Sequence, residues 1–184
     1  MTSRTLSKEK IIATAIDLIN DQENLTFTNL SKRLGTRSQA IYNYYPDVLA
    51  VKVAVAIAFY QDLATRLQVD LLGLSGKQAV KAFCNVSVQY ALSKYPVTQQ
   101  ILSIPSGKIN DEELDKNSLM VHGIMLKLLD PIESDEKKQL VLARMLRNLI
   151  DGEIIHVGNG RFNNKLISHR DSFDQMLNIV LENY

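Results

Sequence analysis

The side chains best suited to chemistry in this sequence lie in TRSQAIYNYY, residues 36–45. Ile41 and Tyr45 are four residues apart, so on a helix they share one face and can pack inward. The other side chains then face outward, and their guanidinium, amide and hydroxyl groups can bind phosphate oxygens and base edges. The outward set comprises Arg37, Ser38, Gln39, Tyr42 and Asn43.

A second short helix is predicted just before this stretch, in TFTNLSKRLG. Thr26 is a suitable N-cap, because its hydroxyl can accept a backbone N–H of the first turn. Leu30 and Leu34 share one buried face, and Gly35 can end the helix in the left-handed conformation at little cost. Two short helices with a glycine-containing turn are typical of a helix-turn-helix, although any small α-hairpin gives the same leucine pair and glycine.

The segment LTFTNLSKRLGTRSQAIYNYYPD resembles the N-terminal DNA-binding domain of TetR-family transcriptional regulators. The resemblance rests on a threonine cap, an apolar–small pair, the glycine, an aliphatic–tyrosine pair and a final aromatic. These positions are Thr26, Leu30, Ser31, Gly35, Ile41, Tyr42 and Tyr45. Two positions depart from the family. Tyr44 stands where the family often has histidine, and Val48 where it usually has a lysine that contacts phosphate, so that contact is expected to be missing.

The resemblance implies a regulator, most often a repressor. Such a regulator binds a palindromic operator as a dimer, and a small molecule releases it from the DNA. The DNA contacts that it implies, together with the outward set above, are Thr26, Thr28, Arg37, Ser38, Gln39, Ala40, Tyr42, Asn43 and Tyr44. The partners implied are double-stranded DNA, a small-molecule effector and a second copy of the chain.

The rest of the chain is predicted to be all-α, because no segment of useful length alternates with period two. A long helix over Val48–Leu72 is apolar nearly all round in its first half, as in a helix that other helices enclose. It would join a DNA-binding domain, residues 1–47, to an effector-binding and dimerisation domain, residues 48–184. Further helices are predicted over residues 75–95, 97–104, 111–129, 134–157 and 168–184, with Ser75, Ser134 and Ser168 as caps and Pro96 as a break.

The C-terminal stretch resembles one subgroup of TetR-family C-terminal domains. The shared features are a glycine inside the long helix, a glycine–phenylalanine loop and a serine–phenylalanine start of the last helix, here Gly152, Gly160 with Phe162, and Ser172 with Phe173. The resemblance implies that the last two helices pair with those of a second subunit, although they could instead close their own domain. The expected interface residues are Leu142, Met145, Leu149, Gly152, Phe173 and Leu177.

Composition limits the compartment and the binding partners that the protein can have. The 184 residues carry a net charge of +1, so nucleic-acid binding requires the basic groups to gather on one face. The single cysteine, Cys84, excludes an intrachain disulfide and fits a reducing compartment. The polar N-terminus has no signal core, and the apolar run at 48–60 is interrupted by Lys52 and is far shorter than a membrane span, so we expect a cytoplasmic protein.

The sequence offers no metal, cofactor or catalytic motif. His122, His156 and His169 are not at ligand spacing, and no nucleophile elbow or phosphate-binding glycine loop is present. Two classes of function remain: a ligand-responsive DNA-binding regulator, or an all-α enzyme or interaction module whose N-terminal hairpin only packs. For a regulator, a mostly apolar effector pocket is expected from Phe83, Cys84, Tyr90, His122 and Met125.

Overall fold

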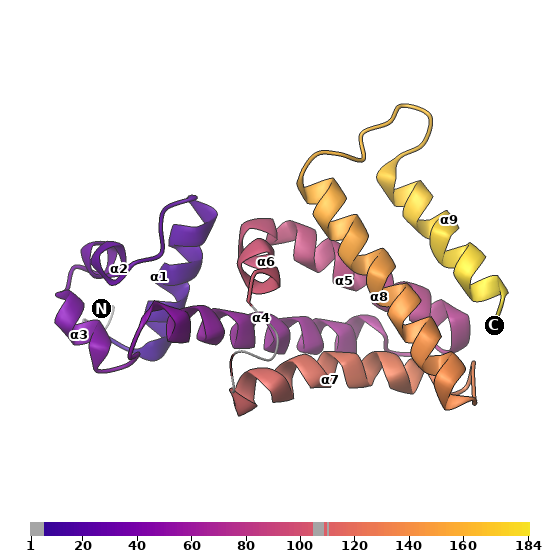
Figure 1. Ribbon diagram of the computed structural model, residues 1–184, viewed down its shortest axis with the longest axis horizontal. Coiled ribbons are helices and arrows are strands. Elements are labelled where there is room, and N and C mark those ends of the chain that lie inside the picture. Colours follow the sequence, from indigo (N-terminus) through magenta and orange to yellow (C-terminus); the bar gives the residue numbers. More distant parts are fainter. Residues whose placement is uncertain (1–5, 105–108, 110) are drawn as a thin grey trace. The chain divides into compact units, whose positions relative to one another are not determined.

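A computed structural model describes residues 6–104, 109 and 111–184 (Figure 1). Over those residues every regular element is an α-helix and no strand occurs, which confirms the predicted all-α class. The helices are α1 (Lys8–Asn20), α2 (Phe27–Leu34), α3 (Ser38–Tyr42), α4 (Val48–Asp70), α5 (Gly76–Ser93), α6 (Tyr95–Leu102), α7 (Glu112–Leu129), α8 (Glu136–Gly158) and α9 (His169–Glu182).

The helices group into two compact units. The first comprises Met1–Phe59 with Pro96–Asp115, and the second Tyr60–Tyr95 with Lys116–Tyr184. This division differs from the predicted domains of 1–47 and 48–184, because the first half of α4, together with α6, packs with the N-terminal helices. The boundary between the compact units therefore falls inside α4 rather than at the turn before it.

Local sequence explains the helices of the first unit. The Ser7 hydroxyl accepts the Lys10 N–H at 3.3 Å and begins α1, and the Thr26 hydroxyl accepts the Asn29 N–H at 3.1 Å and begins α2. Gly35 ends α2 with φ of 64°, the left-handed conformation that favours glycine. Ile11, Ala15, Leu18, Leu30 and Ile41 are fully buried between these helices.

The helix α3 is shorter than predicted. It spans five residues and ends at Tyr42, although Tyr45 is buried inward as predicted. The backbone N–H groups of Tyr44 and Tyr45 both donate to the Ile41 carbonyl, so the chain leaves the helix in a turn before it reaches Pro46. Proline restricts the backbone of the residue before it to extended angles. Here the chain leaves the helical conformation earlier than that, already at the end of α3.

Three helix starts also differ from the sequence prediction. Asp135, not Ser134, caps α8, and its carboxylate accepts the Lys138 N–H at 2.9 Å. Ser75 occupies the N-cap position of α5, but its side chain makes no capping hydrogen bond. Pro96 lies inside the first turn of α6, where a backbone N–H would have no hydrogen-bond partner within the helix, so its absence costs nothing. The preceding helix, α5, has already ended at Ser93. Pro105 and Gly107 follow the helix predicted over residues 97–104 and would end it by their residue types, but both lie outside the described residues.

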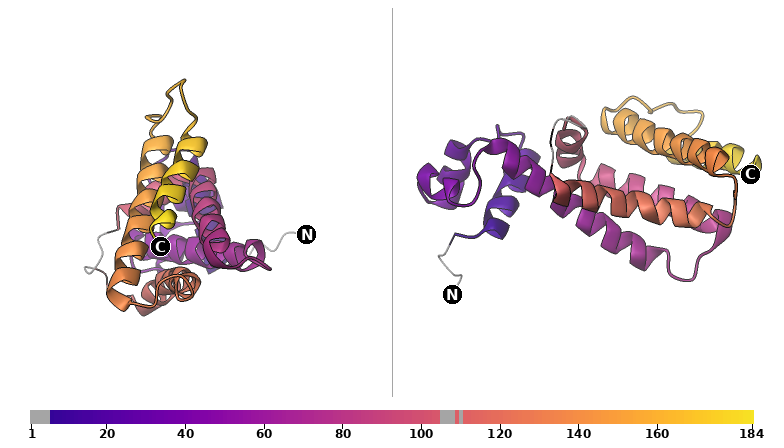
Figure 2. Two further views of the ribbon diagram at one scale, coloured as in Figure 1. Left: turned by 90° about the vertical axis from the view of Figure 1, so that its right-hand side faces the viewer. Right: turned by 60° about the horizontal axis from the view of Figure 1, so that its bottom comes forward.

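The second unit is built around α8, which packs against both α5 and α9. Figure 2 shows α8 and α9 side by side. Leu142, Leu146 and Ile150 recur every four residues on α8 and form its buried stripe. Gly158 ends this helix against the ring of Tyr95, where an added Cβ would overlap the ring carbons, so any larger residue would require the Tyr95 side chain to move.

The long helix α4 contributes to the cores of both units. Val51 and Val55 are buried in the first, and Leu63 and Leu67 in the second. Among the described residues it is the one helix long and apolar enough to cross a membrane by length and composition alone. Core helices of soluble proteins pass the same test.

Candidate DNA-binding site

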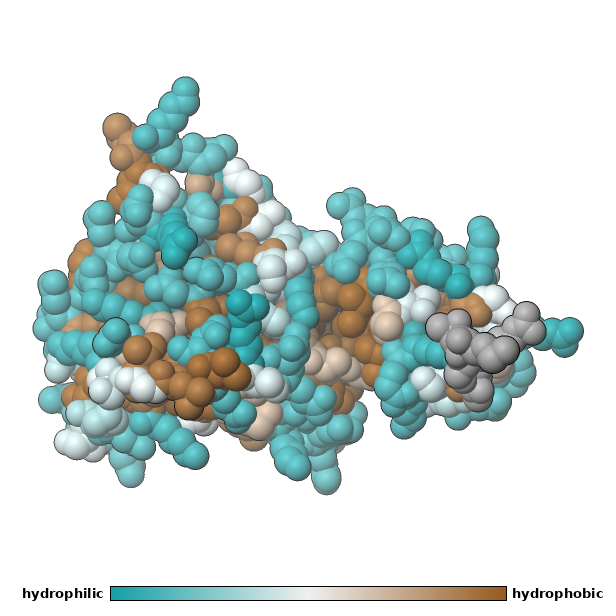
Figure 3. Space-filling view, turned by 180° about the vertical axis from the view of Figure 1, so that it is seen from behind, coloured by the Kyte–Doolittle hydropathy of each residue, from teal (hydrophilic) through white to brown (hydrophobic). Residues whose placement is uncertain are grey.

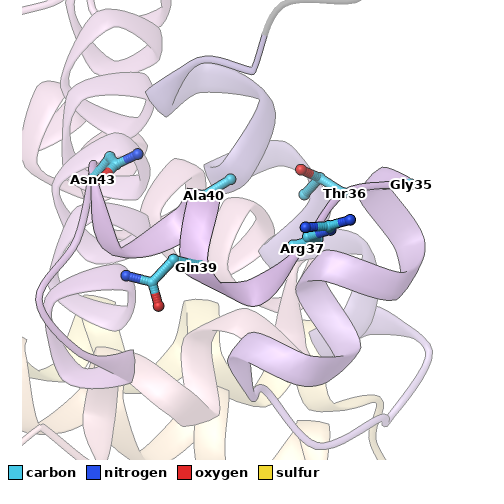
Figure 4. Close-up of a pocket in the computed structure, with 6 residues that line it drawn as sticks. All are labelled: Gly35, Thr36, Arg37, Gln39, Ala40 and Asn43. Carbon is cyan, nitrogen blue, oxygen red and sulfur yellow. The ribbon is translucent and has the colours of Figure 1, made fainter.

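The end of α2, the turn after it and α3 together form an open groove of about 650 Å³ in the first unit. Figure 4 shows Thr36 and Arg37 on the turn, Gln39 and Ala40 on the short helix, and Asn43 directly after it. The lining residues are Gly35, Thr36, Arg37, Gln39, Ala40 and Asn43. A guanidinium and two carboxamides in one groove are the groups that proteins use to bind guanine, adenine and phosphate.

Hydroxyl groups beneath the groove hold α3 onto α2. The Ser38 Oγ lies 3.0 Å from the Ser31 Oγ and 3.3 Å from the carbonyl oxygen of Phe27. The Ser31 hydroxyl in turn donates to the Thr28 carbonyl at 2.9 Å, and Ser31 is buried. Ser38 was predicted to face outward, and the structure instead turns its side chain toward α2.

Two tyrosines near the end of α3 have different surroundings. Tyr42 is 53% exposed, and its ring meets Phe27 edge-on with centroids 4.7 Å apart. Tyr44 is half-buried, and its hydroxyl donates to the Leu6 carbonyl at 2.7 Å, so it ties the start of α1 to the end of the helix-turn-helix. The hydroxyl of Tyr42 is thus the more accessible of the two for a ligand.

The two arginines of this region, Arg33 and Arg37, differ in whether they form ion pairs. Arg33 donates to Asp21 at 2.6 Å and to Glu23 at 2.5 Å, and the Asp21 hydrogen bond raises the pKa of its guanidinium. Arg37 is exposed and lines the groove. Because Arg33 is paired with two carboxylates and does not line the groove, the positive charge among the lining residues comes from Arg37.

Of the nine residues expected to bind DNA, four line the groove, namely Arg37, Gln39, Ala40 and Asn43. Thr26, Thr28 and Tyr42 are exposed outside its lining, and Thr26 uses its hydroxyl as a cap. The sequence analysis did not select Gly35 or Thr36 as site residues. The glycine at the end of α2 could have indicated these two residues, because the turn that follows it lines the groove.

Solved structures with the same arrangement of helices provide the comparison. A protein described as regulatory, SCO4313, is similar with a TM-score of 0.79 at 14% identity, over 97% of each chain. The TetR family transcriptional regulator PfmR from Thermus thermophilus gives 0.67 at 14% identity, over 96% of each chain. A TetR variant from Acinetobacter baumannii AYE in complex with minocycline gives 0.69 at 17% identity, over 97% of this chain and 96% of that one.

The chain has the fold of TetR-type regulators. Comparison with family models and with curated proteins returns no match. The TetR-type fold is therefore established by the three-dimensional likeness and not by the sequence identity.

Within this TetR-type fold, most of the residues expected to form an effector pocket are packed in the second unit. Phe83, Cys84, Tyr90 and Met125 are buried, and His122 on α7 is half-buried. The Tyr90 hydroxyl already donates to the Asp62 carboxylate at 2.7 Å. Burial raises the pKa of Cys84 to about 12, so its thiol stays protonated at neutral pH.

The residues expected at a subunit interface fall into two groups. Leu142, Phe173 and Leu177 are buried in the chain's own core, where α8 meets its neighbours, so they cannot offer a free surface. Met145 is 39% exposed, Leu149 is half-buried, and a Cβ added to Gly152 would meet nothing within 4 Å. Figure 3 shows hydrophobic patches on the molecular surface. On these two helices the exposed apolar side chains are Leu140, Val141, Met145, Ile155 and Ile179.

Proposed function

We propose that this protein is a DNA-binding transcription regulator of the TetR family, and that the groove on α3 contacts duplex DNA. The observation that carries the proposal is the grouping of Arg37, Gln39 and Asn43 in one open groove. In helix-turn-helix proteins the second helix enters the major groove, and its side chains contact base edges. The proposal includes no enzymatic activity.

We further propose that the protein acts as a homodimer. The exposed apolar side chains of α8 and α9 support this, because contiguous apolar surface on a soluble protein commonly marks an interaction site. In a two-fold dimer the same patch on each subunit meets its copy. Two reading helices about 34 Å apart would then enter successive major grooves of a palindromic operator.

Ligand response follows from the same proposal. A small hydrophobic or aromatic effector that binds among the helices of residues 48–184 would favour one spacing of the DNA-binding domains, residues 1–47, over another. Operator affinity would then fall by the effector's differential affinity for the two states. One similar structure, the Acinetobacter baumannii TetR variant, is a complex with minocycline, which supports an effector of this general kind. In this proposal the protein is a cytoplasmic repressor.

The test is a binding-site selection in which the full-length chain is mixed with a random pool of duplex DNA. We expect enrichment of a palindromic sequence, and a gel shift in which that duplex binds more tightly than its scrambled version. The matched control is the Gln39→Ala and Asn43→Ala double variant, which removes both amides of the groove and leaves its fold contacts in place. Recovery of no preferred sequence by the wild-type protein would favour the interaction-module alternative.

A further inference from the structure

The helix that lines the groove starts without a side-chain cap. Arg37 has φ of −98° and ψ of 146°, the extended geometry of an N-cap residue, yet its side chain makes no capping hydrogen bond. The two preceding helices are both capped, by Ser7 and Thr26. A cation at a helix N-terminus is also unfavourable, because that end of the helix carries partial positive charge.

Two serine hydroxyls connect the uncapped start of α3 to α2. Ser38 is the first residue of α3, and its Oγ is 3.0 Å from that of Ser31, seven residues earlier on α2. Each hydroxyl has one proton and a backbone carbonyl within reach, Thr28 for Ser31 and Phe27 for Ser38, and either hydroxyl can be the donor in the pair between them. The start of α3 is therefore fixed to α2 through side chains rather than through its own cap.

We propose that the Ser31–Ser38 hydroxyl pair anchors the start of α3, which has no side-chain cap, and that the N-cap position is thereby available to Arg37, whose guanidinium contacts DNA. In this arrangement the pair sets the position of α3 in the major groove, and with it the choice of bases. The inference rests on the proposed function, since it assigns a positioning role within the same DNA-binding site.

The position of α3 matters more for base contacts than for phosphate contacts. Gln39 directly follows Ser38, and Asn43 comes directly after the end of the helix, so a rotation of α3 moves both carboxamides. Bidentate pairing of an amide with adenine requires a fixed orientation, whereas phosphate contacts carry no sequence information. Loss of the hydroxyl pair should therefore reduce selectivity and leave non-specific affinity almost unchanged.

The first experiment measures the ratio of operator to scrambled-duplex affinity, with the operator taken from the wild-type selection. Loss of one hydrogen bond of ordinary strength corresponds to about a two- to tenfold change, so Ser38→Ala should lower the ratio by about that factor. Ser38→Thr, which keeps the hydroxyl, should restore most of it. Ser31→Ala should also lower the ratio, and the effect of the double variant should be smaller than the sum of the two single effects, because both substitutions remove the contact between the two hydroxyls.

The control is Ile11→Val, which weakens the core of the same unit without touching the pair. It should lower the melting temperature and keep the selectivity ratio. An unchanged ratio in Ser38→Ala would overturn the inference, as would a Ser38→Thr variant no better than the alanine. If the wild-type protein selects no sequence, the proposed function itself fails.

The second experiment needs no DNA. Arg37→Ser places a capping hydroxyl on a backbone that already has N-cap geometry, so we expect its melting temperature to rise above that of the wild type. The same variant should bind DNA more weakly, because the guanidinium is gone. A melting temperature equal to or below the wild-type value would overturn the inference that an arginine at the N-cap position of α3 lowers the stability of the fold.

Discussion

The ring of Tyr42 meets the ring of Phe27 edge-on, with centroids 4.7 Å apart and planes inclined by 75°. The carbonyl of the same Phe27 lies 3.3 Å from the Ser38 hydroxyl, so one residue of α2 contacts both the first and the last residue of α3. Edge-on aromatic pairs are favourable, typically by about 0.5–1.5 kcal/mol beyond the area that they bury. The exposed hydroxyl of Tyr42 is thus presented on a ring whose position is fixed.

We predict that Tyr42→Ala combined with Arg37→Ala weakens operator binding by about tenfold or more, because hydrogen bonds to charged groups contribute the most per bond. Tyr42→Phe serves as the control, since it keeps the contact with Phe27 and loses only the hydroxyl. Fluorescence anisotropy with a labelled operator measures all three proteins. Operator affinity equal to that of the wild type in a double variant with an intact circular dichroism spectrum would contradict the prediction.

Gln39 and Asn43 should determine the sequence preference more than Tyr42 does. Both line the groove, and a bidentate amide–adenine pair contributes about 1–3 kcal/mol of discrimination. Binding-site selection with Gln39→Ala and with Asn43→Ala should each relax one position of the preferred site. Gln89→Ala, an exposed amide on α5, is the matched control and should select the wild-type sequence. If neither groove variant changes the preferred bases, direct readout lies elsewhere.

Gly152→Leu should shift the protein from dimer toward monomer and leave its helices intact. A Cβ at Gly152 meets nothing within 4 Å in the single chain, so we expect the leucine to clash mainly with a second molecule. Overpacking a close contact typically costs about 1–3 kcal/mol, and a symmetric pair meets that cost twice. Sedimentation at micromolar concentration measures the shift.

The control for Gly152→Leu is Gly123→Leu on α7, where an added Cβ also meets nothing within 4 Å. This variant should sediment like the wild type. A wild-type protein that is monomeric at micromolar concentration would remove the proposed interface altogether. A Gly152→Leu variant that stays dimeric would move the interface to another face of the second unit.

The contribution of Asp62 to stability should depend on pH. The hydrogen bonds from Lys94 and from Tyr90 hold the pKa of Asp62 below its ordinary value. A carboxylate with a lowered pKa stabilises the fold above its unfolded-state pKa, about 3.9, and loses that contribution as pH falls through its folded value. We therefore expect Asp62→Asn to lower the melting temperature at pH 7, by an amount that shrinks toward pH 3. A difference that is constant from pH 7 to pH 3 would contradict this assignment.

Sequence reasoning succeeded where the cause of a structure is local. The Thr26 cap and the left-handed Gly35 follow from the residue types themselves, and so do the α2 boundaries. Ser38 and Tyr44 could not be placed in this way, because their partners Phe27 and Leu6 lie 11 and 38 residues away. The ion pairs of Arg33 depend likewise on how the loop before α2 folds back.

The last helices show a second limit of sequence reasoning. Both α8 and α9 carry more apolar side chains than one face can hold, and periodicity does not say which face the chain uses itself. The structure places Leu142, Phe173 and Leu177 inside the core and leaves Val141, Met145 and Ile179 exposed. Only the packing of α5, α8 and α9 against one another separates the two sets.

The most direct test of the central proposal is the change in backbone amide NMR signals when the selected duplex is added to the full-length protein. The account predicts that the largest changes fall on residues 35–43, which form the groove and the short helix along it. A scrambled duplex should produce smaller changes that vanish at moderate salt, because phosphate contacts alone are strongly salt-dependent. Changes confined to residues outside 35–43, with the groove signals unmoved by a duplex that binds, would contradict the account.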